Sequence, residues 1–120
     1  MNYFTASFTF ILILLLSACS PHPATGVWKT ATDNEYGISR LVVAFDGKAE
    51  FISTKLDSAN WHCFWAAKAK YEVELDCTPS TDTLTKERFV LKINEQGLAE
   101  FAHKFRSMIV FEPVNENPAL

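Results

Sequence analysis

Apolar and polar side chains alternate with a period of two along much of the second half of the chain. Between residues 71 and 77 the odd positions are apolar or aromatic, and the even positions are acidic. The next periodic stretch has Phe89 and Leu91 on one face, with Arg88 and Lys92 on the other. This period is typical of a β-strand that has one face buried and the other in water.

The same pattern, interrupted by turn residues, predicts a series of short strands. They cover residues 26–32, 39–45, 48–56, 61–68, 71–77, 87–93, 98–103 and 107–112. Asp46-Gly47 between two of them is one of the strongest hairpin signals, and a short helix near residues 84–88 is the one helical alternative. We expect an all-β fold, an antiparallel meander of seven or eight strands. Closure into a barrel or half-barrel would remove its exposed edges.

The first eighteen residues differ from the rest, because they contain no charged side chain. The apolar run 8–16 is too short to span a bilayer as a helix, which takes about 20 residues, but it has the length of a signal-peptide core. Leu16-Ser17-Ala18-Cys19 follows, and these four residues resemble the lipobox of bacterial lipoproteins.

The resemblance implies cleavage before Cys19, lipidation of that cysteine and attachment to a membrane. Ser20 in the next position implies the outer membrane, on either its periplasmic face or the cell surface. A plain secretory signal or an uncleaved anchor is the alternative, since residues 1–7 carry no Lys or Arg. The expected division is a signal peptide (1–18), a lipidated tether (19–25) with a solvated His22, a β-barrel-like domain (26–113) and a tail (114–120).

Setting Cys19 aside leaves two cysteines, Cys63 and Cys77, in a compartment that permits disulfides. Both lie on the apolar faces of their predicted strands. We expect a disulfide between them, with two buried free thiols or a redox site as the rivals. A redox site is disfavoured because the chain has no Cys-x-x-Cys motif.

Gly26-Val27-Trp28 opens the first predicted strand, and its Gly-x-Trp pattern resembles the lipocalin-like group of small β-barrels. The resemblance implies that Trp28 plugs one end of the barrel and that Arg106 packs over it; an ordinary core tryptophan and a surface arginine are the alternatives. It also implies a small apolar ligand. A second aromatic group, Trp61-Phe64-Trp65, could line a ligand cavity or cap a partner site, although core packing is the interpretation that we favour.

The remaining composition argues against several classes of function. A net charge of −3 without clustered Lys or Arg disfavours nucleic acid as a partner. Catalytic motifs and metal-ligand spacings are absent from the sequence, so we expect no enzyme activity, cofactor or metal. Glu72, Glu74 and Asp76 share one strand face, and a solvated face explains them better than a catalytic or calcium site.

Two hypotheses for function therefore remain. The first is a membrane-anchored envelope lipoprotein that serves as a non-enzymatic interaction module for another envelope protein. The second is a lipocalin-like binder of a small apolar ligand. The volume of the barrel interior separates them, since a ligand site needs several hundred Å³ of cavity.

Overall fold

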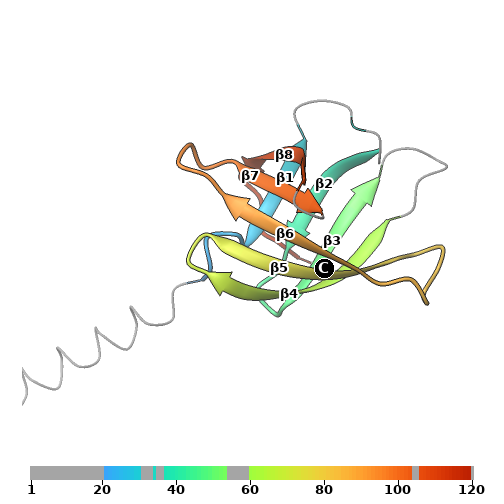
Figure 1. The fold of residues 1–120 in the computed structure, drawn as a ribbon. Helices are drawn as coiled ribbons and strands as arrows, with labels where there is room; N and C mark the ends of the chain where they lie inside the picture. Colours follow the sequence, from blue (N-terminus) through green and yellow to red (C-terminus); the bar gives the residue numbers. More distant parts are fainter. Residues whose placement is uncertain (1–20, 31–33, 35–36, 54–59, 104–105, 120) are drawn as a thin grey trace, which may run out of the picture.

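The computed structural model describes residues 21–119, except for 31–33, 35–36, 54–59 and 104–105. For residues 106–108 it describes the backbone alone. The chain forms a closed antiparallel barrel of eight strands, each paired with the next in sequence (Figure 1). The predicted all-β barrel is thereby confirmed, and closure is complete.

The strands follow the predicted order, and most bounds agree within two or three residues. They are β1 (Gly26–Thr30), β2 (Ile38–Val43), β3 (Lys48–Ser53), β4 (Trp61–Ala69), β5 (Glu72–Pro79), β6 (Glu87–Ile93), β7 (Ala99–His103) and β8 (Arg106–Val114). The helix considered near residues 84–88 does not form. Residues 80–86 make turns instead, and Glu87 and Arg88 already belong to β6.

The pairing of β1 with β8 closes the barrel. Its register runs from Val27 opposite Val114 to Thr30 opposite Phe111. This ladder satisfies the backbone groups that an open sheet would leave unpaired at its two edges. Among the described residues there is no helix long and apolar enough to cross a membrane.

Glycine permits two of the hairpins at one end of the barrel. Gly47 has φ +89° in the β2–β3 hairpin, and Gly97 has φ +79° in the β6–β7 hairpin. In each, a backbone bond closes a three-residue loop, from Ala44 N–H to Lys48 O and from Asn94 N–H to Leu98 O. Three-residue hairpin loops need a left-handed residue, which glycine adopts without steric cost. Asp46-Gly47 therefore predicted the first hairpin correctly.

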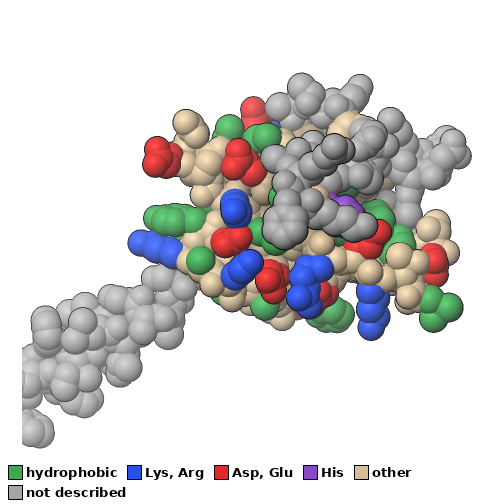
Figure 2. Space-filling model, in the orientation of Figure 1, with side chains coloured by type: hydrophobic (Ala, Val, Ile, Leu, Met, Phe, Trp, Pro, Cys, Tyr) green, Lys and Arg blue, Asp and Glu red, His purple; other side chains and the backbone are tan. Residues whose placement is uncertain are grey.

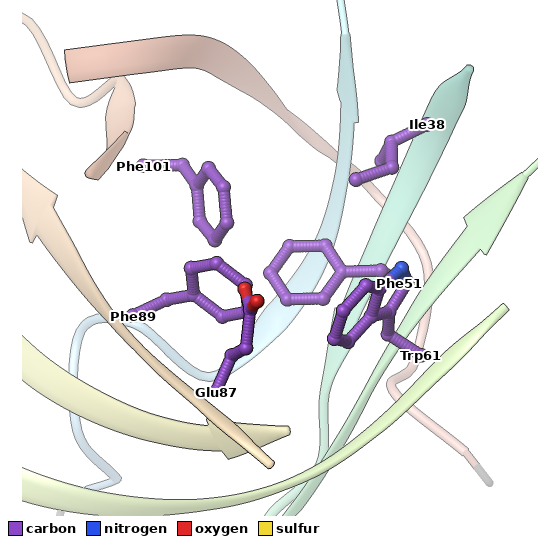
Figure 3. A pocket seen from close by; sticks show the side chains of 6 residues that line it. All are labelled: Ile38, Phe51, Trp61, Glu87, Phe89 and Phe101. Carbon is purple, nitrogen blue, oxygen red and sulfur yellow. The ribbon is translucent and has the colours of Figure 1, made fainter. Parts of the chain in front are cut away.

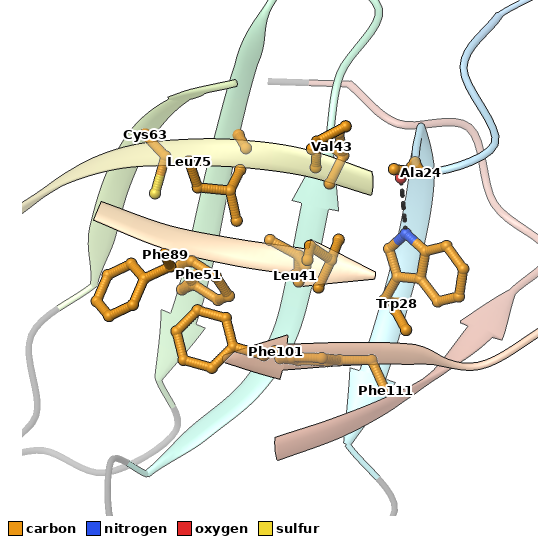
Figure 4. Packing of buried hydrophobic residues seen from close by; sticks show 14 of the residues in the cluster. Ala24, Trp28, Leu41, Val43, Phe51, Cys63, Leu75, Phe89, Phe101 and Phe111 are labelled. Carbon is orange, nitrogen blue, oxygen red and sulfur yellow. Dashed lines mark hydrogen bonds between the residues drawn. The ribbon is translucent and has the colours of Figure 1, made fainter. Parts of the chain in front are cut away.

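Aromatic rings fill the centre of the barrel (Figure 4). The ring centroids of Phe51 and Phe101 are 4.9 Å apart, and those of Phe89 and Phe101 are 4.6 Å apart. Phe51, Phe101 and Phe111 are among the largest fully buried side chains. Eight strands enclose a space that inward-facing side chains of this size can fill.

Replacing Phe51 with Ala should destabilise the fold by about 3–5 kcal/mol, because the removed ring leaves a cavity that the closed sheet relaxes around only partly. Urea unfolding followed by fluorescence measures this loss. The control is Leu84→Ala, since Leu84 is 93% exposed and such a change should stay within about 0.5 kcal/mol. Equal effects of the two substitutions would contradict the assigned core.

Candidate functional site

The barrel interior contains a cavity of about 20 Å³ near one end. Figure 3 shows its lining, in which the rings of Phe51, Phe89 and Phe101 face one another, with Ile38, Trp61 and Glu87 around them. Such a space holds about one water molecule. Ligand pockets are typically about 300–1,000 Å³, so this cavity cannot take a small apolar ligand without repacking of the rings.

A histidine and a carboxylate lie at this end, which we call the open end. His103 Nε2 is 3.5 Å from Glu87 Oε2, and the His103 ring packs 4.9 Å from Phe89. An imidazole beside a carboxylate can move a proton, but the other residues that line the cavity are hydrocarbon or aromatic. Within the described residues, no three His, Cys, Asp or Glu side chains gather in a way that could hold a metal ion.

The opposite end, the closed end, is covered by the residues that precede β1. Ala24 is fully buried, and the Trp28 indole Nε1–H donates to Ala24 O at 3.0 Å (Figure 4). The Trp65 indole Nε1–H likewise donates to Ala44 O, at 2.7 Å. The ring of Trp28 is buried and that of Trp65 is partly buried, and each indole satisfies its one donor.

His22 belongs to this cover, and the expectation that it is solvated was wrong. Its Nε2 lies 2.7 Å from Ala69 O, its Nδ1 accepts from Ala24 N–H at 3.1 Å, and its ring is 6.0 Å from Trp65. Ala69 is 47 residues away in sequence. Local composition therefore gave no sign of this contact.

The candidate aromatic residues do not form one site. Trp28 is 4% exposed at the closed end, where Trp65 also lies, whereas Trp61 packs against Phe89 at the open end. Phe64 packs with neither tryptophan in the core, because its side chain points outward from β4 and is 69% exposed. The two-residue period of a strand predicts this outward direction, since Trp61, Cys63 and Trp65 are at odd positions and Phe64 is at an even one.

Two predicted residues fall at least partly outside the described residues. Cys19 precedes them. The backbone of Arg106 begins β8 opposite His103, while Trp28 lies opposite Pro113, seven residues further along that strand. The side chain of Arg106 is outside the described set, so its contact with Trp28 stays a prediction.

The acidic face of β5 is neutralised by neighbouring strands. Asp76 Oδ1 accepts from Arg88 Nε at 2.9 Å, and this bond raises the pKa of the arginine above its usual value. Glu74 lies 3.6 Å from Lys68, and the ion pair of Glu72 with Lys92 spans 3.7 Å. Figure 2 shows basic and acidic side chains intermixed on this side of the barrel. Three carboxylates that each have a cationic partner form a solvated charged face.

An acidic turn residue lies in the β5–β6 loop. The Thr85 hydroxyl donates to Asp82, and so does the Leu84 N–H, which together lower the pKa of Asp82. Hydrogen bonds of this kind stabilise the charged form of the carboxylate. The site is a turn in which the carboxylate supports the backbone, and it offers no group for chemistry.

An exposed aromatic side chain stands in a surface groove on the outer face of β4, β5 and β6. Phe64 is flanked across the sheet by Lys48 on β3 and by Asp76 on β5. The groove has a volume of about 680 Å³, and Thr78, Lys86, Glu87 and Arg88 complete its lining. One exposed aromatic ring beside an arginine can serve as an anchor in a contact with another protein, because these two residue types carry much of the binding energy at interfaces.

Cys63 and Cys77 form a disulfide, as predicted. They lie directly opposite each other on β4 and β5, with Cα atoms 4.0 Å apart, and both side chains are buried in the core. The bond joins the two strands that present the outer charged face. No family model, curated protein or solved structure matches the chain.

Removing the disulfide by the double substitution C63S/C77S should cost about 3 kcal/mol of unfolding free energy, because the bond closes a loop of roughly 15 residues in the unfolded chain. Urea unfolding measures the loss, and reduction of the wild-type chain should reproduce it. Thiol labelling after denaturation without reductant should leave Cys63 and Cys77 unreacted. Labelling of both would contradict the bond.

Proposed function

We propose that this chain is a lipid-anchored protein of the bacterial envelope whose barrel is a non-enzymatic interaction module for another envelope protein. The observation that carries the proposal is the combination of a filled barrel interior with Phe64 exposed in an outer groove. A barrel without room inside must act through its outer surface or its ends.

The anchoring part of the proposal rests on Leu16-Ser17-Ala18-Cys19. The disulfide between Cys63 and Cys77 supports it, because structural disulfides persist in oxidising compartments such as the periplasm. Ser20 after the cysteine favours the outer membrane within the same resemblance. Two or more acyl chains on Cys19 would hold the protein stably on a bilayer, at about 0.8 kcal/mol for each buried CH₂ group.

The surface around Phe64 has the composition of a protein-binding site. An aromatic anchor that can enter a pocket on the partner lies beside the Arg88–Asp76 ion pair, and Lys48 lies on its other side. Aromatic and arginine side chains dominate the binding energy of most protein interfaces, while charges around them set specificity. We therefore place the partner on the outer face of β4–β6.

The alternative, a lipocalin-like binder of a small apolar ligand, receives less support. It requires an internal space that Phe51, Phe89 and Phe101 occupy, where about 20 Å³ is left. The Gly26-Val27-Trp28 pattern remains compatible with that group of barrels, and Trp28 does pack at the closed end. A lipocalin-like fold whose interior is filled would still have to act through its surface.

The substitution Cys19→Ser should release the protein from membranes into the soluble envelope fraction, because it removes the sulfur that would carry the lipid. Fractionation and immunoblotting measure the release, and intact mass of the wild-type protein should show acylation at residue 19. A wild-type chain with an unmodified thiol there would refute the anchoring proposal.

A photo-crosslinking amino acid at Thr78, on the rim of the groove, should capture one distinct envelope protein in living cells. The substitution F64S should weaken that binding by about 2 kcal/mol, or roughly 30-fold in affinity, since it removes a central aromatic anchor.

The matched controls are a crosslinker at Val110 and the substitution V110S, because Val110 is 42% exposed on the outer face of β8. Neither should affect capture of the partner. Capture of nothing but a second copy of this chain, or equal yields from Thr78 and Val110, would contradict a distinct partner on the β4–β6 face.

A further inference from the structure

We infer that the closed end of the barrel rests on the lipid surface, with Phe45 and Tyr71 in the membrane interface. The inference builds on the proposed lipidation of Cys19 and concerns what that anchor does to the barrel. It assigns a binding surface for lipid headgroups to the tips of the β2–β3 and β4–β5 hairpins.

Residues 21–25 are part of the barrel and do not act as a free tether. His22 is bonded to Ala69 O in the β4–β5 hairpin, and Thr25 N–H and its hydroxyl both donate to His22 O, at 3.0 and 2.6 Å. Ala24 is fully buried beneath Trp28. Figure 1 shows this segment beside the β4–β5 hairpin. The chain from His22 onward is thus held by the barrel.

The chain between Cys19 and the barrel is short. Cys19 is two residues before Pro21, and two residues span at most about 7 Å. The headgroup layer on one side of a bilayer is of similar thickness, about 5–8 Å, from the difference between the core and the whole bilayer. A lipid on Cys19 would therefore hold Pro21 at the outer edge of the headgroups, whatever the conformation of Ser20 between them.

The closed end of the barrel carries two exposed aromatic rings. Phe45 is 64% exposed at the β2–β3 hairpin, and Tyr71 is 52% exposed at the β4–β5 hairpin. Lys70 Nζ lies 5.4 Å from the Tyr71 ring centroid. Exposed aromatic rings with a neighbouring lysine are typical of protein surfaces at the level of lipid headgroups. The third hairpin of this end carries Glu95 and Gln96 and no aromatic ring, so the contact is restricted to the two tips with exposed rings, of which the β2–β3 tip also carries Asp46.

A groove of about 360 Å³ lies between the start of the described chain at Pro21 and the first of these tips. Pro21, Pro23 and Phe45 line it, together with Pro113 and Pro118 from the C-terminal part of the chain. Its lining thus combines proline and aromatic carbon with the polar residues Glu116 and Asn117, and the Glu116 carboxylate is paired with Arg40 at 2.6 Å. Lipid headgroups and the first methylenes of an acyl chain are the occupants that fit this position.

This placement has a consequence for the rest of the molecule. With the closed end on the lipid, the open end with Glu87 and His103 faces away from the bilayer. The Phe64 groove then lies on the side wall, accessible to a partner that stands beside the protein on the same membrane. The short tether would limit the orientations that the barrel can adopt there.

Hydrogen exchange of the lipidated full-length protein tests the inference, on vesicles of phosphatidylethanolamine and phosphatidylglycerol. Amides of residues 45–47 and 70–71 should exchange several-fold more slowly than in the soluble Cys19→Ser protein. Residues 83–85 in the far loop should not change. The substitutions F45S and Y71S together should abolish the slowing, because they remove both rings from the proposed lipid contact. The control L84S changes the far loop and should leave the slowing intact. All three side chains are exposed, so the variants should fold as the wild type does.

A second variant separates the effect of the short tether from that of lipidation. A flexible Gly/Ser linker of about twelve residues between Ser20 and Pro21, with a mean reach of about 20 Å, should keep the protein on the vesicles and reduce the slowing at both hairpins. A lipidated, vesicle-bound wild-type protein without slowing at these hairpins would overturn the inference and leave the anchor intact. An unmodified Cys19 by mass would overturn both. Equal slowing at residues 83–85 would indicate non-specific adsorption and also overturn it.

Discussion

Closure of the sheet by the β1–β8 ladder is the constraint on which the rest of this structure depends. It runs from Val27 opposite Val114 to Thr30 opposite Phe111 and leaves the sheet without an open edge. A closed barrel of eight strands has a narrow interior whose volume is set by strand number and tilt. The inward side chains of all eight strands must therefore fit one fixed space. Near the open end, Phe51, Phe89 and Phe101 pack against one another and leave a cavity of about 20 Å³.

The filled interior determines where the protein can interact. Its buried inward side chains are hydrocarbon, aromatic or part of the disulfide, and among the described residues no polar or charged side chain is fully buried; Glu87 and His103 lie at the open end of this interior. Recognition is consequently left to the outer face and the two ends, which differ in composition. The wall of β4–β6 pairs its charges strand by strand around Phe64. The open end carries a histidine and a carboxylate, and the closed end carries Phe45 and Tyr71 near the start of the described chain.

The closed end connects the fold to the proposed anchor. His22 and Ala24 are fixed by hydrogen bonds and burial that come from β1, β4 and the hairpin between β4 and β5. The two prolines at residues 21 and 23 suggest a linker, but these contacts make residues 21–25 part of the barrel. If Cys19 carries a lipid, as proposed, this fixed segment would pass the position of the lipid to the strands through a connection of only two residues.

Sequence alone determined the elements that depend on neighbouring residues. Apolar runs between turn residues located the eight strands, with a clear period of two in β5 and β6, and Asp46-Gly47 located a hairpin. The even number of cysteines after Cys19 and the apolar strand faces of Cys63 and Cys77 predicted their disulfide. It misplaced Phe64 among the core aromatics and left His22 in solvent, although the parity of position 64 already pointed outward. Tertiary structure decided closure, the volume left inside, the His22–Ala69 contact and the Glu87–His103 pair. The physical reason is range: strand period and turn chemistry act over a few residues, whereas the filling of a closed barrel depends on the summed volumes and register of all its strands.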